Sequence, residues 1–136
     1  MKVTLRITNL TIVCILLANA GSKAQSANAD SSFYGTWKGT SICQIKNSPC
    51  HDETVVFYVS KSAKENLIEL KGNKIVNGVE EEMGIIDFRY DPVSKEIVSV
   101  SQPDAIWKFR KNKNSMSGTL TYNGQLSRIV NLTRQN

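Results

Sequence analysis

Residues 33–39 read Phe-Tyr-Gly-Thr-Trp-Lys-Gly and begin the first strand that the sequence predicts. Gly35 allows a tight turn of the backbone shortly before Trp37, because a glycine has no Cβ to restrict its torsion angles. An indole on the inner face of this strand is large enough to fill one end of a sheet that closes on itself. The stretch therefore predicts a closed β-structure with Trp37 as the plug of one end.

The chain beyond this stretch divides into short runs of β-branched and aromatic residues, separated by turn residues. Asn77-Gly78 and Asn123-Gly124 have the composition of type I′ hairpin turns, and Gly72-Asn73 indicates a β-bulge. No run shows the apolar spacing of an amphipathic helix. We predict eight strands, at about 35–43, 54–60, 66–76, 84–90, 96–101, 105–111, 115–122 and 125–134.

The predicted fold class is all-β, an eight-stranded antiparallel up-and-down barrel. Closure is expected because it removes both exposed edges of the sheet, and a two-sheet sandwich of the same strands is the alternative. In the barrel the last strand runs antiparallel beside the first, which places Arg134 nearer to Trp37 than Arg128. Strand 54–60 is apolar on both faces, so we expect its outer face to be covered by the N-terminal arm or by a partner.

The first and last strands resemble the lipocalin and calycin superfamily. Gly35-Thr36-Trp37 is similar to its G-x-W signature, across which a basic residue of the last strand packs. The resemblance implies that Gly35, Trp37 and Arg134, or alternatively Arg128, close the barrel. The chain has neither the usual second motif nor a C-terminal helix, so the resemblance implies a lipocalin-like barrel and not a transport lipocalin.

The N-terminus has the pattern of a secretory signal peptide, with basic Lys2 and Arg6 followed by a short apolar run. We predict a signal peptide at 1–24, with cleavage after Ala20 as the alternative, then a flexible leader at 25–32 and one domain at 33–136. Removal of 1–24 lowers the formal net charge from +5 to +2. The mature protein is expected to be exported, periplasmic or secreted, and monomeric, with no stable membrane span and no nucleic acid as partner.

Cys43 and Cys50 are the cysteines that remain after cleavage, and in an oxidising compartment they are expected to form a disulfide. Together with His51 and Asp52 they could alternatively bind zinc, although their spacing is not that of a usual zinc site. His51 beside acidic residues also suggests a general base, but no nucleophile accompanies it. Glu80-Glu81-Glu82 could hold calcium or form a solvated loop. We therefore predict no catalytic residues, no metal and no cofactor.

Aromatic side chains on the predicted inner faces suggest a ligand site. They are expected either to line a pocket or to fill the barrel, since a barrel of this size is just wide enough for its own side chains. Our first hypothesis is a non-catalytic protein that binds a small apolar ligand in or at the mouth of the barrel. The alternative is an exported protein-binding module, such as a protease or lysozyme inhibitor, that uses the disulfide-stapled loop 43–52. The predicted ligand-binding residues are Phe88, Tyr90, Trp107 and Tyr122.

Overall fold

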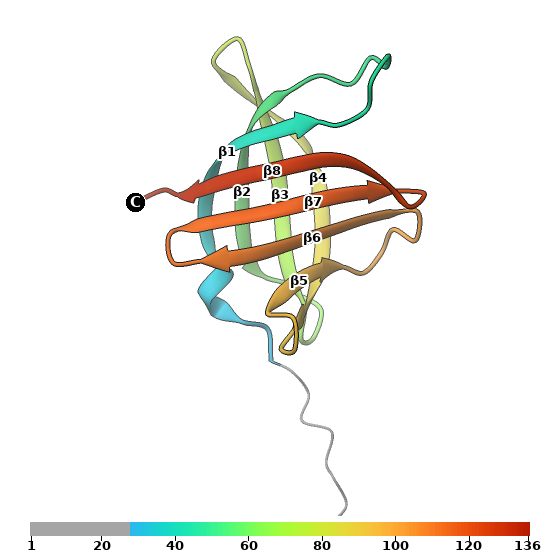
Figure 1. The fold of residues 1–136 in the computed structure, drawn as a ribbon. Coiled ribbons are helices and arrows are strands. Elements are labelled where there is room, and N and C mark those ends of the chain that lie inside the picture. Colours follow the sequence, from blue (N-terminus) through green and yellow to red (C-terminus); the bar gives the residue numbers. More distant parts are fainter. Residues whose placement is uncertain (1–27) are drawn as a thin grey trace, which may run out of the picture.

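The structure, a computed structural model, describes residues 28–136, which form a closed barrel of eight antiparallel strands (Figure 1). Each strand pairs with the next along the chain and β8 pairs with β1, so the up-and-down barrel is confirmed and the two-sheet sandwich is wrong. The predicted signal peptide 1–24 and residues 25–27 of the predicted leader lie outside the described residues. Within 28–136, no helix is long and apolar enough to cross a membrane. The elements are η1 (Ser31–Phe33), β1 (Gly35–Cys43), β2 (Glu53–Lys61), β3 (Ile68–Val76), β4 (Val79–Asp91), β5 (Glu96–Ser99), β6 (Ala105–Asn112), β7 (Ser115–Tyr122) and β8 (Gln125–Arg134).

The barrel closes along the seam between β1 and β8. Trp37 lies opposite Arg134 in this seam, and Gly39 lies opposite Leu132. The two backbones approach closely at Gly39, where a Cβ atom would stand 1.9 Å from the carbonyl oxygen of Asn131. The seam therefore depends on the absence of a side chain at this position.

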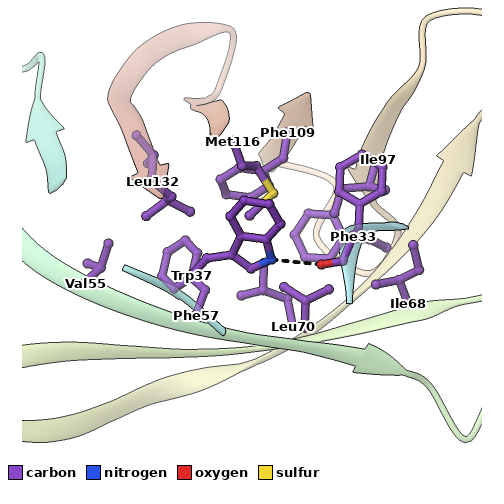
Figure 2. Packing of buried hydrophobic residues seen from close by; sticks show 13 residues of the cluster. Phe33, Trp37, Val55, Phe57, Ile68, Leu70, Ile97, Phe109, Met116 and Leu132 are labelled. Carbon is purple, nitrogen blue, oxygen red and sulfur yellow. Dashed lines mark hydrogen bonds between the residues drawn. The ribbon is translucent and has the colours of Figure 1, made fainter. Parts of the chain in front are cut away.

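Trp37 fills the end of the barrel at which β1 begins and β8 ends. Its side chain is completely buried, and its indole Nε1–H donates to the carbonyl oxygen of Phe33 at 2.8 Å (Figure 2). The guanidinium carbon of Arg134 lies 4.2 Å from the centroid of the indole, and its Nη2 donates to the carbonyl oxygen of Ser32 at 2.6 Å. The predicted neighbourhood of Trp37 and Arg134 is confirmed, and we call this the closed end.

The described part of the predicted leader packs against the barrel. Ser31–Phe33 form a short 3₁₀ helix with Asp30 as its N-cap, and Oδ1 of Asp30 accepts from the N–H of Ser32. Phe33 is buried, and Ala29 packs against the same core. Ala29 and Phe33 therefore contact the core of the barrel.

Two bulges shift the register of the sheet. The first lies between Gly72 and Asn73, as predicted, and leaves Met83 of β4 without a partner in β3. The second leaves Ser127 of β8 without a partner in β7. Because an extra residue reverses the alternation beyond it, Leu126 turns outward and is 41% exposed. Simple alternation along the last strand, which would place Leu126 on the same face as Arg128, therefore does not hold across this bulge.

The β3–β4 hairpin is longer than predicted, since residues 79–83 are part of β4. Both residues of its turn have positive φ angles, 51° at Asn77 and 79° at Gly78, as a type I′ turn requires. The carboxylate of Glu80 accepts from the hydroxyl of Tyr58, which lies on the outside of β2 and is 38% exposed. The outer face of β2 is therefore buried at Val56 and exposed at Tyr58 in the described residues, and its cover by a partner stays a prediction.

Candidate functional site

A cavity of about 250 Å³ lies inside the barrel, at the end opposite Trp37. Its inner wall is apolar and aromatic, while its outer part is bordered by the polar side chains of Ser41, Glu53 and Arg128. The predicted filled interior is therefore correct for the closed end only. We call the other end the open end. The remaining lining residues are Val55, Phe57, Leu70, Gly72, Met83, Gly84, Ile86, Phe88, Gln102, Trp107 and Phe109.

The aromatic wall of the cavity is centred on Phe109. The indole of Trp107 stacks on this ring with a centroid distance of 5.9 Å and an angle of 8° between the planes. Phe57 meets the same ring edge-on at 5.9 Å, and Phe88 approaches it at 5.8 Å. Phe109 is held from outside the cavity as well, because it lies over Gly118, where a Cβ atom would stand 2.2 Å from its Cδ1. These contacts hold the wall in one arrangement.

Arg128 forms the polar edge of the cavity together with Glu53. Its Nη1 lies 3.3 Å from Oε2 of Glu53, and the two side chains are only 16% and 15% exposed. The same Nη1 donates to the hydroxyl of Ser41 at 3.1 Å and to the carbonyl oxygen of His51 at 3.3 Å. A buried charge is tolerated when it is paired and hydrogen-bonded, and this arrangement satisfies both conditions.

The β3–β4 hairpin and the connection between β5 and β6 border the mouth of the cavity. Met83 stands at the bulge of the β3–β4 hairpin and is 45% exposed, although its side chain also lines the cavity. Gln102 lies in the exposed connection between β5 and β6. The cavity therefore ends at the rim of the barrel, where a small molecule can enter without crossing the closed end.

Two of the four predicted ligand-binding residues line this cavity, and two do not. Phe88 and Trp107 are part of its wall. Tyr90 lies farther along β4, toward the closed end, where its ring is 6.1 Å from that of Phe33. Tyr122 is the last residue of β7, is 52% exposed and does not line the cavity. The inner face of a strand includes positions at both ends of the barrel, and alternation alone does not separate them.

The polar residues of the site were missed by the sequence analysis. Arg128 was considered only as an alternative closure residue, although it shares its strand face with the apolar Val130. Glu53 comes two positions before Val55, on the inner face of β2. A basic and an acidic residue on inner faces that meet at one end of the barrel are the signal that could have indicated this pair.

The disulfide between Cys43 and Cys50 is present, as predicted. Oδ1 of Asp52 accepts from the backbone N–H of Cys43 at 2.9 Å, so it ties the two ends of the loop together. Both sulfur atoms are bonded to each other, which removes them as zinc ligands. The side chain of His51 is 74% exposed and its Nε2 lies 4.0 Å from Oε1 of Glu53.

The three consecutive glutamates are strand residues and not a loop. Hydrogen bonds from Asn73 and from Tyr58 lower the pKa of Glu80, and burial opposes them. Glu81 and Glu82 pair with lysines of the neighbouring strand, Glu82 at 2.8 Å from Lys71. Within residues 28–136, no group of three or more His, Cys, Asp or Glu side chains could hold a metal ion.

Comparison with models of known protein families gave no match, and a search of curated proteins gave none either.

Proposed function

We propose that this protein is a non-catalytic binder of a small apolar ligand, which it holds in the cavity at the open end of the barrel. The observation that carries the proposal is a cavity of about 250 Å³ with an apolar, aromatic wall and a few polar groups at one edge. Ligand sites generally combine these features, and their volumes begin at about 300 Å³. A cavity just below that size favours a ligand smaller than most drug molecules.

The proposal includes export and a relation to the lipocalin-like barrels. The disulfide between Cys43 and Cys50 supports an oxidising compartment, as does the signal-peptide pattern of the sequence. The Trp37 plug, covered by Arg134, supports the relation to lipocalin-like proteins. In this assignment the closed end stabilises the barrel, and the open end binds the ligand.

Native mass spectrometry of the protein purified from its own host tests this proposal directly. We expect a co-purifying small molecule, and we expect its removal to change the tryptophan emission, because Trp107 lines the cavity. The amide and indole signals of cavity residues should shift when the molecule is added back, while those around Arg134 should not. Absence of any bound molecule, together with no shift of cavity signals by small aromatic probes, would contradict the proposal.

A protein-binding module that uses loop 43–52 is the second candidate function. The observation in its favour is that the loop is held before any partner binds, by the disulfide and by the hydrogen bond from Cys43 to Asp52. A loop that is already ordered loses less conformational entropy on association. Inhibition assays against lysozyme and a panel of secreted proteases test it. Replacement of the exposed His51 by Ala should then weaken inhibition, whereas replacement of Tyr122 should not.

A further inference from the structure

Arg128 uses only part of its hydrogen-bonding capacity on the protein. Its contacts with Glu53, Ser41 and His51 all involve Nη1. The Nε–H and the Nη2 group donate to no acceptor among residues 28–136. These two groups lie on the same side of a guanidinium and form a fork that can hold one or two acceptor atoms. Arg128 lines the cavity, and our proposal places this fork within reach of a bound molecule.

The charges of the site are already balanced. Arg128 and Glu53 are the ionisable side chains that line the cavity, and they form an ion pair with each other. An anionic ligand would therefore leave one negative charge without compensation in a largely apolar cavity, which is unfavourable. A neutral acceptor, such as a carbonyl oxygen, can use the free donors and adds no net charge.

We infer that the ligand is a small, neutral molecule with an apolar body and a single carbonyl-type acceptor, which binds to the free Nε and Nη2 donors of Arg128. This inference rests on the proposed function, because it names the class of ligand for the same cavity. The volume allows roughly eight water-sized groups, since a water molecule takes about 30 Å³. The parallel rings of Trp107 and Phe109 favour a planar body that continues the stack.

Three probes of similar size test which polar group the ligand carries. Acetophenone carries a neutral acceptor, benzoate carries an anionic acceptor, and ethylbenzene carries none. Dissociation constants are measured with the full mature protein by ¹H–¹⁵N NMR titration, which reports on the Nε–H of Arg128 and on the indole of Trp107. We expect acetophenone to bind about tenfold more tightly than ethylbenzene, because it gains a hydrogen bond to a charged donor. Benzoate should bind more weakly than acetophenone.

Replacement of Glu53 by Gln changes the predicted order of the probes. Glu53→Gln keeps the shape of the side chain and removes the negative charge beside Arg128, so benzoate should gain at least about fivefold relative to acetophenone. Arg110→Gln is the matched control, because Arg110 lies on the outside of β6 and forms a similar pair with Glu96 at 3.1 Å. It should leave all three constants unchanged. Circular dichroism confirms that both variants are folded.

The outcomes distinguish this inference from the proposed function. If none of the probes binds in the cavity, the proposed function itself is contradicted. If ethylbenzene binds as tightly as acetophenone, or if benzoate binds more tightly than acetophenone to the unmodified protein, the cavity binds small molecules but the neutral acceptor is wrong. These comparisons use the unmodified protein, so they remain decisive even if Glu53→Gln fails to fold.

Discussion

Arg134 places its guanidinium carbon 4.2 Å from the centroid of the Trp37 indole, directly across the seam between β1 and β8. Arg128 is in the same strand and contacts Glu53 at the opposite end of the barrel. The strand β8 therefore supplies one arginine to the closed end and a second arginine to the cavity. The two arginines should respond differently to mutation, because the first covers Trp37 at the closed end and the second is the residue that we propose to bind the ligand.

Replacement of Arg134 by Lys should destabilise the protein by about 2 kcal/mol, although the charge is kept. An ammonium group cannot donate to the carbonyl oxygens of Ser32 and Tyr34 in the fork geometry of a guanidinium while it also covers Trp37. Thermal unfolding should show a melting temperature lower by roughly 5–15 °C. Ligand binding at the open end should be unchanged. The exposed Arg110→Lys serves as control, and equal effects of both variants would contradict this role.

Replacement of Gly39 by Ala should open the seam of the barrel. The new Cβ would stand 1.9 Å from the carbonyl oxygen of Asn131, and backbone atoms cannot move away as a side chain can. We expect a loss of about 3 kcal/mol or more, measured by urea unfolding. Gly124→Ala is the comparison: its φ is +77° and no atom lies within 4 Å, so only backbone strain of about 1 kcal/mol is expected.

How far the sequence predicts this molecule depends on the range of the interactions. Alternation and turn residues are local, and they predicted the strands and the two Asn-Gly hairpins. The bulge at Ser127 follows from pairing with β7, so nothing near Leu126 in sequence showed that it would turn outward. The Arg128–Glu53 pair joins β8 to β2 only after the barrel has closed. The sequence therefore predicted where the strands lie better than it predicted which residues form the site.

Replacement of Asp87 by Asn should change how the stability depends on pH. The hydrogen bond from Lys64, at 2.6 Å, lowers the pKa of Asp87; burial opposes this effect, and Ser62 adds to it. A lowered pKa means that the stabilisation is complete above the unfolded-state value of about 4 and is lost as the pH falls through the folded value. Between pH 5 and about 2 the free energy of unfolding should thus fall more steeply for the unmodified protein than for Asp87→Asn. Asp104 lies in an exposed connection, so for Asp104→Asn the free energy of unfolding should fall as steeply as for the unmodified protein.

Loss of the disulfide should affect mainly the loop that it closes. For Cys43→Ser with Cys50→Ser, the chain-entropy model gives a loss of about 2–3 kcal/mol for a loop of this length. Amide hydrogen exchange should become faster in 44–52, while the amides of β6 and β7 keep their relative protection. A uniform rise in the exchange rate across the whole barrel would show that the disulfide stabilises the entire fold and not only this loop.

Replacement of Gly72 by Val should separate folding from ligand binding. Gly72 lines the cavity, and a Cβ at this position would lie 3.4 Å from the ring of Phe57 and 3.7 Å from Cε of Met83, which are ordinary van der Waals distances. Stability should be kept or should rise slightly, because a glycine within a strand costs about 0.5–1 kcal/mol relative to alanine.

The new methyl groups of this variant occupy part of the space that a ligand needs, so acetophenone should bind at least tenfold more weakly than to the unmodified protein. Ser117→Val is the matched control, since it adds a valine to the exposed outer face of the barrel. Binding is measured by NMR titration and stability by urea unfolding, on both variants. If folded Gly72→Val binds the probe as tightly as the unmodified protein, the ligand does not bind in the cavity, and the search for function moves to the stapled loop 43–52.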